Sequence, residues 1–320
     1  MLRRLLRVVL ALVAIAFLGY GLARNWDETT RAVAAMSPWA VLGAFAAVLT
    51  GQFFMLVAWR EILAGLGTRV PLRIAGRIMF VGQLGKYIPG AVWAYAAMMD
   101  LGRDHGSPPR RTFATISLGL VINLGVGISI AAATLGSLEA VRQAWYLVLL
   151  VPVIIVCLHP KVLTWGLNLA LRIARKEPLE SVLPGRTVVV AVAWTALGWF
   201  VYGLHIWLVA GRWDLYLVAT GAYAFAWATG ILTVVVPAGV GVREGALVLV
   251  LGPIVGTPVA LAVAIVSRLA FTLADAAAAG IAFLLGRRQT ASSAPAYADQ
   301  NGSGSTALTP DRNLSGSPEA

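Results

Sequence analysis

Residues 237–245 read PAGVGVREG, and this stretch decides how the surrounding chain folds. One proline and three glycines stand beside an adjacent pair of opposite charges, Arg243 and Glu244, in a region otherwise made of Val, Leu and Ala. The stretch has three interpretations: a glycine-rich phosphate loop, a plain turn between two helices, or a helix broken inside a membrane. The composition of the chain and the residues on either side separate them.

Composition places the chain in a membrane. Hydrophobic residues make up 59% of its 320 residues and charged residues 12%, whereas a soluble domain is about half apolar and about a quarter charged. The apolar residues form blocks close to the roughly 20 residues that cross a bilayer as a helix. We therefore expect an all-α polytopic membrane protein with about six full transmembrane helices, at 5–22, 38–62, 111–134, 143–158, 187–210 and 257–285.

The first of these spans has an alternative. A basic start followed by an apolar stretch also describes a signal peptide, with Gly21 and Ala23 as small residues near a cleavage site. The apolar stretch at 5–22 is longer than the usual signal-peptide core of about 7–15 residues. Its length favours an uncleaved first span.

Two further apolar stretches are interrupted. Residues 72–101 are broken at GKYIPG, and residues 215–252 are broken at PAGVGVREG. Proline and glycine disrupt helical hydrogen bonding, and the backbone groups released there cannot face lipid, so they must line protein or a watery cavity. We expect each stretch to form a re-entrant broken-helix hairpin. The alternative for the second is a full crossing, because residues 215–235 alone are long enough to span the bilayer.

Basic residues assign the two sides of the membrane. The net charge is +11, which in a membrane protein indicates cytoplasmic loops beside anionic lipid rather than nucleic-acid binding. With re-entrant hairpins and a cytoplasmic N-terminus, most Lys and Arg fall in cytoplasmic loops, and the outer loops hold Arg24, Arg31, Arg142 and Arg212. This bias predicts that both termini are cytoplasmic, and it supports the re-entrant hairpins.

The expected segments form an inverted repeat. The first unit comprises 38–62, which runs from outside to inside, the hairpin 72–101, which re-enters from the cytoplasm, and 111–134, which returns to the outside. The second unit has the opposite orientation and comprises 187–210, 215–252 and 257–285. Secondary transporters use this pattern, with discontinuous helices near the bilayer midplane. The sequence therefore predicts a transporter-like arrangement.

Two regions lie outside these spans. Residues 160–180 place leucines at helical spacing among basic residues, which is typical of an interfacial or loop helix. Residues 289–320 are rich in Ser, Gly, Ala and Pro and lack the apolar content of a core. We expect a membrane domain over 1–288 and a disordered polar tail over 289–320.

Five charged residues fall inside apolar segments: Lys86, Arg243, Glu244, Arg268 and Asp275. A charge at the middle of a bilayer costs about 2.5–3.5 kcal/mol on insertion scales, so such residues usually face a cavity or each other. Arg268 and Asp275 are seven residues apart and lie on one face of the last span. We expect Glu244, Arg268 and Asp275 to balance charge or gate, and the alternative is an internal ion pair that only fixes helix packing.

Both breaks favour binding of a negatively charged group. Half-helices that start near Gly90 and Val242 would direct their N-terminal N–H groups and positive dipole ends toward an anion. Lys86 and Arg243 add a formal positive charge at each break. In a membrane the anion could be a lipid phosphate, and the expected headgroup-binding residues are Lys86, Tyr87, Pro89, Gly90, Pro237, Gly239, Gly241 and Arg243.

Enzymatic signatures do not appear in the sequence. The glycines at 239, 241 and 245 have the wrong spacing for G-x-G-x-x-G, and the acidic residue expected about 20 positions later is missing. His105, His159 and His205 have no metal-ligand spacing. We expect no cofactor, no metal and no catalytic residue. A relay role for His205 is an alternative to the commoner satisfied buried histidine.

Two motifs resemble the flippase-like transmembrane domain of the lysylphosphatidylglycerol synthase family: GQLGKYIPGAVW at 82–93 and VPAGVGVREGAL at 236–247. The order of spans agrees over roughly residues 5–286. The resemblance implies movement of a lipid or lipid-linked headgroup across the bacterial cytoplasmic membrane. This chain departs from the family at 91–93, where Ala, Val and Trp stand in place of an acidic residue that many members carry. The soluble aminoacyl-transferase domain of fused members is absent here, so we do not expect lipid aminoacylation.

The leading hypothesis is a flippase-like protein whose partners are membrane lipids, either an anionic phospholipid or a polyprenyl-phosphate-linked lipid. An alternative is a non-catalytic scaffold or regulator with a membrane enzyme partner that modifies envelope lipid or glycan. A membrane-embedded transferase is a weaker third hypothesis, because catalytic motifs are missing from the sequence.

Overall fold

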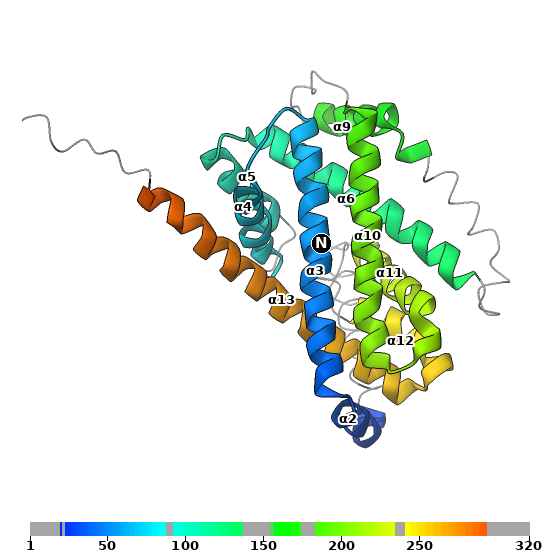
Figure 1. Cartoon of the computed structure of the whole chain (residues 1–320). Coiled ribbons are helices and arrows are strands. Elements are labelled where there is room, and N and C mark those ends of the chain that lie inside the picture. Colours follow the sequence, from blue (N-terminus) through cyan, green and yellow to red (C-terminus); the bar gives the residue numbers. More distant parts are fainter. Residues whose placement is uncertain are drawn as a thin grey trace, which may run out of the picture.

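The structure is a computed structural model that describes residues 20, 23–87, 92–136, 154, 156–173, 183–233 and 241–292. Throughout these ranges the ordered elements are helices, and no strand occurs in them (Figure 1). Among the described residues, five helices are long and apolar enough to cross a membrane: Pro38–Gly65, Pro109–Leu135, Gly185–Ala210, Trp213–Leu232 and Thr257–Leu285. The chain is an all-α, multi-pass membrane protein.

The elements follow one another in this order: α2 Trp26–Ala34, α3 Pro38–Gly65, α4 Leu72–Gly76, η1 Arg77–Val81, η2 Leu84–Tyr87, α5 Trp93–Asp104, α6 Pro109–Leu135, α9 Pro160–Ile173, α10 Gly185–Ala210, η4 Trp213–Leu215, α11 Tyr216–Leu232, α12 Val242–Val255 and α13 Thr257–Ser292. Helices α3, α6, α10 and α13 confirm four of the expected spans. The expected spans at 5–22 and 143–158 lie almost entirely outside the described residues.

Helices α3 and α10 form the central pair of the bundle (Figure 1). They run antiparallel, because Gly43 at the start of α3 faces Leu208 near the end of α10. At the crossing, a Cβ on Gly198 would lie 2.8 Å from Met55 Cε. Small residues at such positions let helix backbones approach closely, which is how helices pack where lipid removes the hydrophobic driving force.

The first interrupted segment folds back on itself as a hairpin. It passes through α4, the π-helical η1 and the 3₁₀-helical η2 before α5 begins. A Cβ on Gly85 would lie 2.6 Å from the backbone nitrogen of Ala94, so the two arms touch through their backbones. The predicted interruption is confirmed, and the closely packed arms favour the predicted hairpin. Residues 88–91, which include the end of GKYIPG, lie outside the described residues.

The second interrupted segment consists of α11 and α12, which pack against each other. Helix α12 begins at Val242, as the sequence predicts. Gly241 precedes it with a φ of 83°, in the left-handed region that favours glycine. The re-entrant path of this segment and the inverted repeat stay predictions.

Helix α13 crosses the bundle obliquely and links its parts (Figure 1). It contacts α12 and α2, then α3, η1, η2 and α4. Its packed face is made of small residues, with Ala260, Ala264 and Ala274 all nearly inaccessible to solvent. The helix continues to Ser292, four residues into the stretch expected to be a polar tail, and residues 293–320 lie outside the described residues. Helix α13 therefore meets both interrupted segments.

Candidate functional site

Two opposite charges on α13 hold the two interrupted segments. Asp275 forms an ion pair with Lys86 of η2, with 2.6 Å between Oδ2 and Nζ. Arg268 forms an ion pair with Glu244 of α12, with 3.6 Å between Nη1 and Oε1. The two positions lie two turns apart on one helix face, as the sequence predicts. Each interrupted segment thus delivers one charge to α13, and the two charges are opposite in sign.

Asp275 accepts hydrogen bonds from three side chains. Besides Lys86, the Tyr87 hydroxyl donates to Oδ2 at 2.6 Å and the Gln52 amide donates to Oδ1 at 2.9 Å. The Asp275 side chain is 10% exposed, whereas that of Lys86 is 37% exposed. The buried carboxylate therefore ties η2, α3 and α13 together, and Lys86 is the more accessible member of the ion pair.

Glu244 shapes the start of α12. Its Oε2 accepts a hydrogen bond of 2.6 Å from the backbone N–H of Gly241, three residues earlier. A Glu at the third helical position commonly satisfies the N–H that precedes the helix in this way. Its other oxygen faces Arg268. The GVRE motif therefore combines a glycine with a positive φ, a helix start and a charge directed at α13.

Arg243 has no carboxylate partner among the described residues. Its guanidinium lies over the rings of Tyr223 and Phe271, with Cζ at 4.6 Å and 4.9 Å from the two ring centroids. Those rings stack on each other with their centroids 5.2 Å apart. The Arg243 Nη2 atom is buried and has no hydrogen-bond partner in the structure. A buried donor without a partner is costly, and an acceptor oxygen placed against Nη2 would remove this cost.

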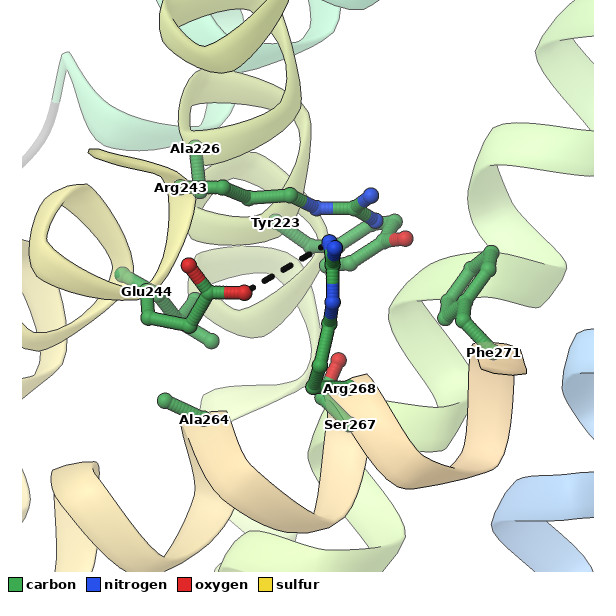
Figure 2. Close-up of a pocket in the computed structure, with 9 residues that line it drawn as sticks. Tyr223, Ala226, Arg243, Glu244, Ala264, Ser267, Arg268 and Phe271 are labelled. Carbon is green, nitrogen blue, oxygen red and sulfur yellow. Dashed lines mark ion pairs between the residues drawn. The ribbon is translucent and has the colours of Figure 1, made fainter. Parts of the chain in front are cut away.

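A small pocket, partly open to its surroundings and with room for about one water molecule, lies beside Arg243 (Figure 2). In Figure 2, Arg268 rises from α13 toward Arg243 and Glu244, and Phe271 lies one turn further along the helix. The described lining residues are Tyr223, Ala226, Arg243, Glu244, Leu247, Ala264, Ser267, Arg268 and Phe271. Two guanidiniums and one carboxylate give this lining a net positive charge.

His205 hydrogen-bonds to Ser267, one of the residues that line the pocket. It is fully buried, with Nδ1 against the carbonyl of Tyr202 and Nε2 2.8 Å from Ser267 Oγ. A carbonyl only accepts, so Nδ1 carries the proton and Nε2 accepts from the serine hydroxyl. The interpretation of His205 as a satisfied buried histidine is confirmed.

The structure separates the residues that the sequence grouped together. It brings Arg243, Glu244 and Arg268 to the pocket, with Gly241 capping α12 beside them. Lys86 and Tyr87 lie instead at Asp275 and do not line the pocket. The other four expected headgroup residues lie outside the described residues: Pro89, Gly90, Pro237 and Gly239.

Ser267 and Phe271 are among the pocket residues that the sequence did not single out. Both are on α13 next to Arg268, one residue before it and three residues after it. The signal that could have found them is helical spacing, since Ser267, Phe271 and Asp275 follow each other at intervals of four.

Residues 4–279 match the family model for the lysylphosphatidylglycerol synthase TM region. The chain belongs to this family. Comparison with curated proteins gives no match. The family assignment agrees with the apolar helices of the fold, and the protein is an integral membrane protein of a lipid-related family.

Proposed function

We propose that the protein binds the anionic headgroup of a lipid or lipid-linked molecule at the Arg243 pocket and moves it across the bacterial cytoplasmic membrane. The observation that carries the proposal is Arg243: a guanidinium in a membrane-embedded pocket with no described carboxylate partner and with a buried, unsatisfied Nη2. Ionisable residues inside membranes usually mark substrate pathways. A phosphate offers the acceptor oxygens that such a guanidinium can bind in a bidentate manner.

The local sequence supports an anion rather than an unseen carboxylate as the partner of Arg243. The link from α11 to α12, residues 234–240, reads VVVPAGV and contains no charged residue. Neither Glu244 nor Asp275 is free, because each already accepts hydrogen bonds or ion pairs from other groups. A ligand is therefore the simplest source of a negative charge at Arg243.

The two ion pairs on α13 suggest how movement would occur. The Glu244–Arg268 pair is long, at 3.6 Å, whereas the Lys86–Asp275 pair is short, at 2.6 Å. A phosphate entering the pocket would compete with Glu244 for Arg268 and loosen the contact between α12 and α13. The headgroup could then pass the break without any covalent step, so we propose transport without catalysis. We further propose that the partners are membrane lipids and that both termini are cytoplasmic.

Reconstitution in vesicles tests this proposal. Fluorescent phospholipids and polyprenyl phosphates placed in one leaflet should exchange faster with the protein than in empty vesicles. Arg243→Gln should abolish the acceleration by removing the charge, and Arg243→Lys should retain part of it by keeping the charge without the bidentate fork. Equal amounts of folded protein are the control. No movement above empty vesicles across the whole lipid panel would refute the proposal.

A second candidate function follows from the internal ion pairs. Lys86, Glu244, Arg268 and Asp275 all have partners within the protein, which suits a rigid scaffold for a membrane enzyme. This candidate predicts that an enzyme of lipid or glycan modification co-purifies in stoichiometric amount. It also predicts that cellular function survives substitution of Lys86 and Arg243, which the transport proposal forbids.

A further inference from the structure

We propose that the Arg243 pocket is matched to a phosphodiester headgroup that carries one negative charge and no ammonium group. This inference rests on the proposed function and narrows its ligand to one chemical class. It comes from the charge balance of the pocket and from the hydrogen-bonding groups that the protein leaves unpaired there.

Charge balance selects a monoanion. The described lining contains Arg243, Arg268 and Glu244 as its charged side chains, two cations against one anion. Residues 234–240, which precede α12 in the sequence, contain no charged side chain that could change this balance. A phosphodiester supplies one negative charge and neutralises the pocket, whereas a phosphomonoester carries about −1.5 to −2 near pH 7. Uncompensated charge inside a membrane is expensive, so the diester fits best.

The unpaired hydrogen-bonding groups select a ligand rich in acceptors. Arg243 Nη2 is a buried donor with no partner, and guanidinium nitrogens cannot accept. The Tyr223 hydroxyl is also buried without a partner, on a residue that is 1% exposed and lines the pocket. Both groups belong to one contact, since the Arg243 guanidinium lies over the Tyr223 ring. Phosphate oxygens can accept from both.

The same pocket disfavours an ammonium group. Such a group needs an anionic acceptor, and the one carboxylate in the described lining, Glu244, is already engaged by the Gly241 N–H and by Arg268. The carboxylate of Asp275 accepts from Lys86, Tyr87 and Gln52. Neither Glu244 nor Asp275 is therefore available to bind the ammonium of a headgroup that carries an amine.

Competition among lipids with the same acyl chains tests the inference. The full chain in detergent micelles is incubated with an equimolar mixture of phosphatidylglycerol, phosphatidic acid, phosphatidylethanolamine and aminoacylated phosphatidylglycerol. Native mass spectrometry then reads which lipid is retained. We expect phosphatidylglycerol to exceed each of the others by about tenfold or more, because each of the others leaves at least one unit of charge uncompensated in the pocket.

Two charge variants should shift this preference in opposite directions. Glu244→Gln keeps a side chain that can cap α12 and raises the pocket charge by one, so the preferred lipid should become the phosphomonoester, phosphatidic acid. Arg243→Gln lowers the pocket charge by one, so the zwitterionic phosphatidylethanolamine should gain relative to phosphatidylglycerol. Arg212→Gln, which removes an exposed arginine paired with Asp214 outside the pocket, is the control and should leave the ranking unchanged.

The outcomes separate this inference from the proposed function. Equal retention of all four lipids, or a ranking that neither variant moves, overturns the phosphodiester match while leaving Arg243-dependent lipid movement in vesicles intact. If no lipid depends on Arg243 in either assay, the proposed function itself fails. Soluble glycerophosphoglycerol is added as a further competitor: displacement of the lipid assigns the site to a free phosphodiester, and no displacement assigns it to the lipid.

Discussion

Gly85 offers a direct test of the first hairpin. In the structure a Cβ at this position would lie 2.6 Å from the backbone nitrogen of Ala94 and 2.8 Å from its Cα. Ordinary van der Waals contact begins near 3.4 Å. Gly85→Ala therefore forces the arms of the hairpin apart by several tenths of an ångström, and backbone atoms cannot rotate away as a flexible side chain would.

The expected cost follows from this geometry. Overpacking by one methyl group costs about 1–3 kcal/mol, which should lower the melting temperature of the full chain in micelles by about 2–6 °C. Because Lys86 is the next residue, its ion pair with Asp275 should weaken as well. The sequence motif explains Gly85 as a helix breaker, whereas the structure explains it by close approach to α5.

Gly280→Ala is the matched control for this test. Gly280 lies on α13 with nothing within 4 Å of a Cβ, so alanine there should leave stability unchanged or raise it by up to about 1 kcal/mol through helix propensity. Thermal unfolding followed by circular dichroism compares the two variants. If Gly85→Ala is as stable as Gly280→Ala, the closely packed hairpin is wrong.

Two further predictions concern the pocket. Glu244→Ala should destabilise the protein by about 1 kcal/mol because the Gly241 N–H loses its acceptor, whereas Glu244→Gln should retain most of that stability; thermal unfolding of both variants distinguishes a capping role from a purely ionic one. Tyr223→Phe should leave the melting temperature unchanged, since the hydroxyl has no partner in the protein, and should weaken binding of an anionic lipid by about tenfold or more, the loss of one hydrogen bond to a charged group. An unchanged affinity would show that the hydroxyl does not face the ligand.

Much of the fold could be predicted from the sequence, because lipid imposes simple rules. A helix that crosses a bilayer needs a long apolar stretch, and α3, α6, α10 and α13 follow closely the bounds that this rule predicts. Proline and glycine act locally, so the interruption before α12 and its start at Val242 were also predictable.

The partners of the charged residues could not be predicted. Lys86 and Asp275 are far apart in the sequence, and no local pattern identifies which interrupted segment reaches which end of α13. The stacking of Arg243 on Tyr223 and Phe271 is equally hidden, because aromatic residues in apolar spans occur in packing and in sites alike. Burial and direction of side chains decide these contacts, and both depend on the tertiary arrangement.

The spacing of charges along α13 sets a length scale for the protein. Seven residues of helix separate Arg268 from Asp275, which is about 10 Å along the axis, or about a third of the hydrocarbon core of a bilayer. Under the proposed function, a headgroup that leaves the Arg243 pocket and follows α13 over this length would reach the level of Asp275 and its partner Lys86. This distance is short enough for a flexible headgroup to move from one cation to the other without its charge being uncompensated in lipid.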